Sequence, residues 1–251
     1  MPPQPLDWRS FHHSDRGKVR NVNEDALLDR PDIGLWAVAD GMGGHSSGEL
    51  ASRMIVEELD TLQPQGESLG ALVENIDWRL QRVNHSLLME SQRRGSGIIG
   101  STVAVLLAHE GYCIYLWAGD SRIYLYRRGV LKQLSRDHSQ VEEQLEGEFG
   151  DDRHASGASI TNYITRAVGA NATLALDAEM IEPCAGDRFL LCSDGLNKEL
   201  SDVEIAGILA LQSLSAAADK LLNLCLERGA SDNVTLILVE VGTSAAKTTA
   251  M

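Results

Sequence analysis

The sequence predicts an α+β fold in which antiparallel β-sheets are covered by layers of α-helices. Segments typical of strands come in adjacent blocks and do not alternate regularly with helices. Two segments typical of long helices lie together early in the chain, and two more lie near its end. This order favours antiparallel sheets over a doubly wound parallel sheet. No internal repeat or Pro/Ser-rich linker divides the chain, so we expect one domain over 8–242, with loose termini at 1–7 and 243–251.

The first half of the chain is predicted to supply three strands and then two helices. The apolar run 35–39 is bounded by glycine, which predicts a buried strand. Apolar side chains then recur at helical spacing in two successive segments, and the second is a long amphipathic pattern. The expected strands span 8–13 (an edge strand), 26–28 and 35–39, and the expected helices span 47–62 and 69–94.

The second half is predicted to consist of strands, a polar loop, two helices and a closing strand. Glycine-containing turns separate the apolar, β-branched runs, which is typical of consecutive antiparallel strands. The polar, acidic segment 137–160 predicts a loop or mobile flap. The expected strands span 101–109, 111–117, 121–127, 178–182, 188–192 and 233–241, and the expected helices span 200–211 and 215–228.

Composition and charge exclude several functional classes. The formal net charge of −14 repels phosphate backbones, so we expect no nucleic-acid partner. The N-terminus lacks the pattern of a signal peptide, and no apolar run approaches the ~20 residues of a membrane span. We therefore expect a cytoplasmic protein without a membrane partner. The four cysteines lie far apart without a CxxC pair, which favours reduced core thiols over disulfides or a zinc site: Cys113, Cys184, Cys192 and Cys225.

Four aspartates share one local pattern, in which an apolar run ends and the Asp stands beside Gly, Ser or Asn. They are Asp40, Asp120, Asp194 and Asp232. A single instance is typical of a turn carboxylate. Four carboxylates gathered at one end of a sheet would repel one another and raise their pKa values. Hard divalent cations such as Mg²⁺ or Mn²⁺ relieve this repulsion, and no His or Cys grouping offers a softer site. The pattern therefore predicts oxygen-only metal binding.

Seven short motifs follow one another along the chain. They are SDRGKVRNVNED (14–25), ADGMGGH (39–45) with Gly48-Glu49, GST (100–102), AGDSR (118–122), ITRAVG (164–169), SDG (193–195) and SDNVT (231–235). Each is weak evidence alone, but the ordered set is specific. From about residue 11 to 241 the chain resembles the PPM/PP2C metal-dependent protein Ser/Thr phosphatases in their compact bacterial form. The resemblance implies a four-layer α-β-β-α sandwich, two antiparallel β-sheets flanked by helices.

The resemblance implies a metal-binding role for four of the matching residues. Asp40 resembles the ligand that bridges two metal ions, and the Gly41 carbonyl resembles a ligand of the second ion. Asp194 and Asp232 resemble the remaining ligands of the first ion. The expected cofactors are therefore two Mn²⁺ or Mg²⁺ ions in each active site.

Further residues match the surroundings of those ions in the family. Glu24 and Asp25 resemble acids that reach metal-bound water. Asp120, with Asp194, resembles the pair that takes a third, weaker ion in bacterial members. Arg20 resembles the arginine that clamps the substrate phosphate, because a planar guanidinium matches a phosphate bidentately. A solvated surface cation is the alternative for Arg20.

The resemblance implies a protein phosphatase that hydrolyses phosphoserine and phosphothreonine with a metal-activated water and no phosphoenzyme. Arg20, Asp40 and Asp194 are the residues expected to take part in catalysis. We expect the protein to be a monomer. Its expected partners are phosphorylated proteins, including a cognate Ser/Thr kinase and its substrates. Two alternatives stay open: a non-catalytic phosphoprotein-binding module on the same fold, and a phosphatase dedicated to one regulatory protein.

One position departs from the eukaryotic pattern of the family. Where those enzymes carry a His as the proposed leaving-group acid, this chain has Met42, as bacterial members commonly do. His45 lies nearby, either as a partial substitute or in a turn role, so the leaving-group acid is unassigned. His138 and His154 are expected to be surface histidines of the flap 137–160, whose acidity either influences substrate choice or only keeps the loop solvated.

Overall fold

The computed structural model describes residues 6–43, 47–64, 66–95, 97–139 and 164–243. The strands are β1 Leu6–Asp15, β2 Asp25–Arg30, β3 Leu35–Met42, β4 Gly100–Ser101, β5 Val103–His109, β6 Tyr112–Ala118, β7 Arg122–Arg127, β8 Val130–Gln133, β9 Asp177–Ile181, β10 Arg188–Cys192 and β11 Val234–Thr243. The helices are α1 Ser47–Asp60, α2 Leu69–Arg94, α4 Asp194–Asn197, α5 Asp202–Leu209 and α6 Leu214–Arg228.

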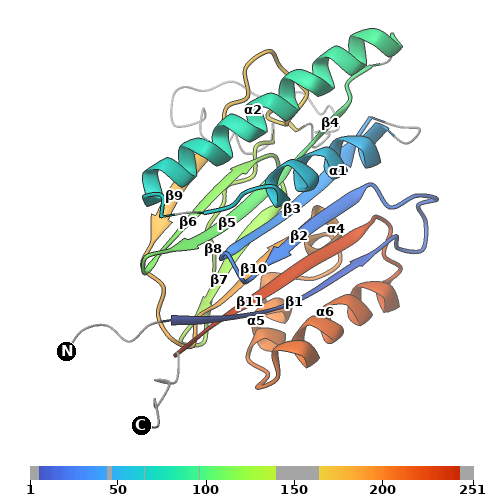
Figure 1. Ribbon diagram of the computed structural model, residues 1–251. Helices are drawn as coiled ribbons and strands as arrows, with labels where there is room; N and C mark the ends of the chain where they lie inside the picture. The colour runs from blue at the N-terminus through green and yellow to red at the C-terminus, as the bar shows by residue number, and fades with distance from the viewer. Residues whose placement is uncertain (1–5, 44–46, 65, 96, 140–163, 244–251) are drawn as a thin grey trace, which may run out of the picture.

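Two antiparallel sheets stack face to face, and helices cover their outer faces (Figure 1). One sheet has the strand order β1-β11-β10-β7-β8, and the other has the order β2-β3-β5-β6-β9, with β4 paired to β3. Helices α1 and α2 pack on the second sheet, while α5 and α6 pack on the first. The predicted four-layer α-β-β-α sandwich is therefore confirmed.

The inner strands β3 and β11 are buried on both faces, which explains why their sequences are almost continuously apolar. In β3, Leu35, Ala37 and Ala39 face α1 and α2, whereas Trp36 and Val38 face the other sheet. The strand β11 repeats this arrangement, with alternate residues packed against α6 and against the opposite sheet. Because side chains alternate across a strand, each of these strands joins two of the three hydrophobic layers.

The structure extends or corrects several sequence-based boundaries. Leu6 and Asp7, assigned to a loose terminus, pair with Thr243 and Gly242 because the β1–β11 ladder runs that far. The short elements β8 and α4 were not predicted, since four residues carry too little periodicity. Most of the predicted flap lies outside the described residues. Cys184 is exposed in the turn before β10 and is not a core thiol, whereas the other three cysteines are buried and all four are free.

Helix α2 matches its predicted span because both of its ends carry local signals. The Ser68 side chain accepts a hydrogen bond from the Ala71 N–H at 3.3 Å, and Gly95 ends the helix in the left-handed conformation at φ 59°. None of the helices in the described parts of the chain is both long enough and apolar enough to cross a membrane.

Candidate active site

The strand ends that carry the predicted carboxylates meet at one end of the two sheets. The β2–β3 register places Asp25 directly opposite Asp40. Asp194 begins α4, with one residue between it and the end of β10, and one residue separates Asp232 from the start of β11, the neighbour of β10. Asp120 lies in the turn between β6 and β7. The antiparallel pairing therefore brings together residues that lie far apart in the sequence.

Close backbone contact at two glycines allows this convergence. A Cβ at Gly41 would lie 2.1 Å from the Gly48 carbonyl oxygen and 2.6 Å from the Glu24 carbonyl oxygen. A Cβ at Gly48 would lie 2.6 Å from Glu24 Oε1. Only glycine leaves room for β3, the start of α1 and the Glu24 carboxylate to approach so closely.

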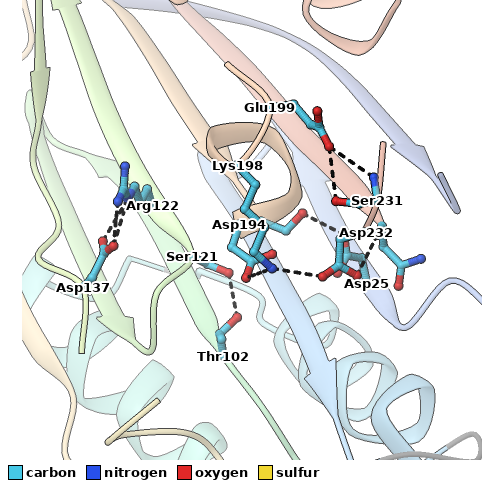
Figure 2. A network of polar contacts seen from close by, with 12 residues as sticks. Asp25, Thr102, Ser121, Arg122, Asp137, Asp194, Lys198, Glu199, Ser231 and Asp232 are labelled. Carbon is cyan, nitrogen blue, oxygen red and sulfur yellow. Dashed lines mark hydrogen bonds and ion pairs between the residues drawn. The ribbon is translucent and has the colours of Figure 1, made fainter. Parts of the chain in front are cut away.

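Hydroxyl side chains hold the backbone of Asp40 in place. The Asp40 N–H donates to Thr102 Oγ1 at 3.0 Å, and its carbonyl accepts from the Thr102 N–H and from Ser101 Oγ, both at 2.9 Å. Thr102 Oγ1 also bonds Ser121 Oγ at 2.7 Å, next to Asp120 (Figure 2). The sequence contained these residues in the motifs 100–102 and 118–122, but no local pattern assigned them a role.

Asn233 fixes the loop that carries Arg20 and Glu24. Its Oδ1 accepts from the Glu24 N–H at 2.8 Å, and its Nδ2 donates to the carbonyls of Arg16 at 2.8 Å and Val22 at 3.0 Å. The asparagine is buried. A single side chain thus ties three points of this loop to the start of β11, a role that sequence reasoning missed.

Burial and mutual repulsion act on the acidic groups at the site. Burial raises the pKa of Asp40 well above its usual range, and the charges of Asp25 and Asp194 raise it further. Burial likewise raises the pKa of Asp25 and of Asp120 to about 6, with Asp194 adding to both shifts. The Oδ1 atoms of Asp25 and Asp120 are buried and have no hydrogen-bond partner. These oxygens need a cation or a proton, since an isolated buried carboxylate is costly.

Two basic side chains contact the other acids of the site. Lys198 Nζ lies 2.5 Å from Asp194 Oδ2 and 3.0 Å from Asp232 Oδ2 (Figure 2). Arg20 contacts both oxygens of Asp232, with Nε 2.8 Å from Oδ1 and Nη2 2.9 Å from Oδ2. Burial raises the pKa of Asp232, but the hydrogen bonds from Arg20 and Lys198 outweigh it and lower that pKa overall. For Asp194 burial prevails over the attraction of Lys198, and its pKa is raised.

His138 is buried, so its prediction as a surface histidine was wrong. Its ring stacks on Trp117 at 6.1 Å, and its Nδ1 accepts from the Gly119 N–H at 3.1 Å. A backbone N–H only donates, so Nδ1 carries no proton, and Nε2–H donates to Asp177 at 3.1 Å. The histidine thus supports the turn that carries Asp120. His45 and His154 lie outside the described residues.

The predicted set of Arg20, Glu24, Asp25, Asp40, Gly41, Asp120, Asp194 and Asp232 lies in this one region. Within the described residues, no group of three or more His, Cys, Asp or Glu side chains is arranged so that it could hold a metal ion. Asp194 and Asp232 instead direct oxygens at Lys198 and Arg20. The donors nevertheless suit a hard divalent ion chemically, because all are oxygens and two are buried without a partner.

Comparison with known proteins points to one family. The protein phosphatase 2C pattern matches residues 12–238. The chain is 33% identical over 237 residues to the serine/threonine phosphatase stp of Listeria monocytogenes, covering 90% of this chain and 93% of that protein. Among solved structures it is similar to PppA, a key regulatory component of T6SS in Pseudomonas aeruginosa, with a TM-score of 0.87 and 42% identity over 94% of this chain and 98% of that one. It is also similar to the catalytic domain of the phosphatase PstP in complex with two manganese ions, with a TM-score of 0.81 and 32% identity over 95% of this chain and all of that one.

Proposed function

The chain belongs to the protein phosphatase 2C family, and we propose that it removes phosphate from phosphoserine and phosphothreonine on proteins. The observation that carries this proposal is the convergence of the acidic residues at one end of the sheets, beside the exposed guanidinium of Arg20. A cluster of buried oxygens suits metal ions, and an adjacent planar cation suits a phosphate. Together these two features suit a metal-dependent phosphoric monoester hydrolase.

We propose that the metal ligands are Asp40, the Gly41 carbonyl, Asp194 and Asp232. Two Mn²⁺ or Mg²⁺ ions would be held there, and Asp120 with Asp194 would take a third, weaker one. The support from this chain is that burial and mutual repulsion raise the pKa values of Asp40 and Asp194. Bound there, the ions would lower the pKa of a water molecule towards neutrality and would neutralise charge on the phosphoryl group.

The protein's own side chains bind and orient the phosphate ester. Arg20 is half exposed, and its hydrogen bond to Asp232 raises its pKa, so the guanidinium stays charged. It can offer two parallel N–H donors to the equatorial oxygens of the phosphate. Asn233 positions Arg20 indirectly, because it fixes the loop on both sides of that residue. Ser193 Oγ donates to Asp25 Oδ2 at 2.8 Å, which orients this second carboxylate opposite Asp40.

We further propose that the phosphatase opposes a Ser/Thr kinase in a regulatory circuit. Support comes from its similarity to PppA, which is described as a regulatory component of T6SS. The substrates would then be the phosphorylated proteins of that circuit, including the kinase itself. A phosphoproteome comparison with and without the gene tests this, because the true substrates gain phosphoserine or phosphothreonine when the phosphatase is lost.

The catalytic proposal is tested with purified protein. With Mn²⁺ it should hydrolyse p-nitrophenyl phosphate and a phosphothreonine peptide, and chelation with EDTA should stop both reactions. Asp40→Asn and Asp194→Asn should each lose roughly 100-fold or more in activity, because each removes a charged ligand. Asp219→Asn, an exposed carboxylate on α6, is the matched control and should keep full activity. Full activity in Asp40→Asn or Asp194→Asn would contradict the assignment.

A further inference from the structure

Lys198 places a positive charge between two proposed metal ligands. It directly follows α4 and lies four residues after Asp194, so its side chain turns back along this short helix. The ammonium group lies 2.5 Å from Asp194 Oδ2 and 3.0 Å from Asp232 Oδ2, and Figure 2 shows the lysine reaching both carboxylates. The ion pairs of Lys198 therefore connect the segment that follows β10 with the segment that precedes β11.

The position of this ammonium group conflicts with a divalent ion held by the same two oxygens. Mg²⁺ takes oxygen ligands at about 2.0–2.1 Å, closer than the two contacts of Lys198. A divalent ion held by Asp194 and Asp232 would therefore have to compete with Nζ for carboxylate oxygens that Nζ already contacts. Two cations on the same pair of carboxylates would lie close together and repel each other.

The lysine also has an easy route out of the site. Its side chain is 45% exposed, and its flexible four-carbon stem can carry the ammonium into water. Arg20 also contacts both oxygens of Asp232, whereas Lys198 contacts Asp194 as well and so joins the two carboxylates. Lys198 lies beyond the motif at 193–195, which is why the sequence assigned it no role.

We propose that Lys198 is an internal competitor of the metal ion at Asp194 and Asp232. Its ammonium group holds the two carboxylates together when no ion binds them, and an entering ion displaces it towards solvent. The lysine thus lowers the affinity of the site for metal and stabilises the metal-free protein. This inference rests on the proposed function, because it takes Asp194 and Asp232 as metal ligands.

The test measures metal binding and stability, not activity. Isothermal titration with Mn²⁺ and thermal melts in EDTA are run on the unaltered protein, Lys198→Met and Lys198→Arg. Lys198→Met should bind Mn²⁺ about fivefold more tightly, since one partly exposed ion pair contributes about 1 kcal/mol. The same variant should melt at a lower temperature in EDTA. Lys198→Arg retains the charge and should stay near the unaltered protein in both measurements.

Lys220→Met, which removes an exposed lysine from α6, controls for the loss of one positive charge elsewhere. Equal Mn²⁺ affinity in Lys198→Met and Lys220→Met would overturn the inference. If Lys198→Met does not fold, Lys198→Gln decides, because it keeps a polar contact without charge and should also bind Mn²⁺ more tightly. Absence of Mn²⁺ binding by the unaltered protein would instead refute the proposed function.

Discussion

Replacement of Asn233 by alanine tests whether one side chain holds the phosphate-binding loop. The substitution removes three hydrogen bonds, to the Glu24 N–H and to the carbonyls of Arg16 and Val22. At about 1 kcal/mol each, their loss lowers the free energy of unfolding by about 3 kcal/mol. For a chain of this length, each kcal/mol shifts the melting temperature by roughly 2–4 °C. We therefore expect Asn233→Ala to melt roughly 6–12 °C lower.

The same substitution should weaken catalysis, because Arg20 lies on the released loop. Small misplacement of a positioning group is costly, so we expect kcat/KM for p-nitrophenyl phosphate to fall roughly 10-fold to 100-fold, with much of the change in KM. Differential scanning calorimetry and steady-state kinetics at saturating Mn²⁺ measure the two effects. Asn223→Ala, an exposed asparagine of α6, is the matched control. If Asn233→Ala matches that control in both assays, other contacts hold the loop and Asn233 does not.

Three further predictions test the packing, electrostatics and phosphate contact of the site. Gly195→Ala should destabilise the protein by about 1–3 kcal/mol in chemical denaturation, because the added Cβ would lie 1.9 Å from the Asn233 carbonyl oxygen. Gly207→Ala is the control: no atom lies near its Cβ position in α5, and the substitution should stabilise the protein by about 0.5–1 kcal/mol. Equal effects of the two would contradict the close contact. Burial raises the pKa of Asp120 from 3.8 to about 6, so the folded state binds the proton more tightly than the unfolded state. Ionisation of this carboxyl group therefore lowers the free energy of unfolding as pH rises from about 4 to 6. A pKa rise of this size corresponds to about 3 kcal/mol at pH 7.5. Asp120→Asn should therefore raise the melting temperature in EDTA by roughly 6–12 °C at pH 7.5 and by less at pH 5, and a pH-independent difference would rule this out. Arg20→Lys should raise KM for a phosphopeptide about 10-fold while changing kcat less, since an ammonium lacks the paired donors. An unchanged KM would contradict the proposed contact of Arg20 with the phosphate.

Local signals predicted much of the fold and the chemistry of the site. The span of α2 follows from a serine cap and a left-handed glycine that flank an amphipathic pattern. The apolar run of β3 predicted its burial, and the four Asp residues at the ends of such runs predicted an acidic site. These features depend on residues within a few positions of one another, so a single sequence displays them directly.

Burial of His138 is an example of what those signals could not predict. Its polar neighbours in sequence favoured exposure, but the ring stacks on Trp117, which lies on the earlier strand β6. A histidine can lie in a surface loop or in a buried position where both ring nitrogens are hydrogen-bonded, so only its tertiary partners decide between the two.

The sequence by itself determined which groups are available: oxygen donors at strand ends, an arginine in a basic loop, and no softer ligand set. Only the tertiary structure decided which of them meet. Ser193 bonds Asp25 across 168 positions, Asn233 bonds Glu24 across 209, and Lys198 contacts Asp232 across 34. Such contacts depend on the register and stacking of two sheets, which bring distant segments together through many weak interactions. No local pattern encodes them, and the contacts of Asn233 and Lys198 became visible only in the folded chain.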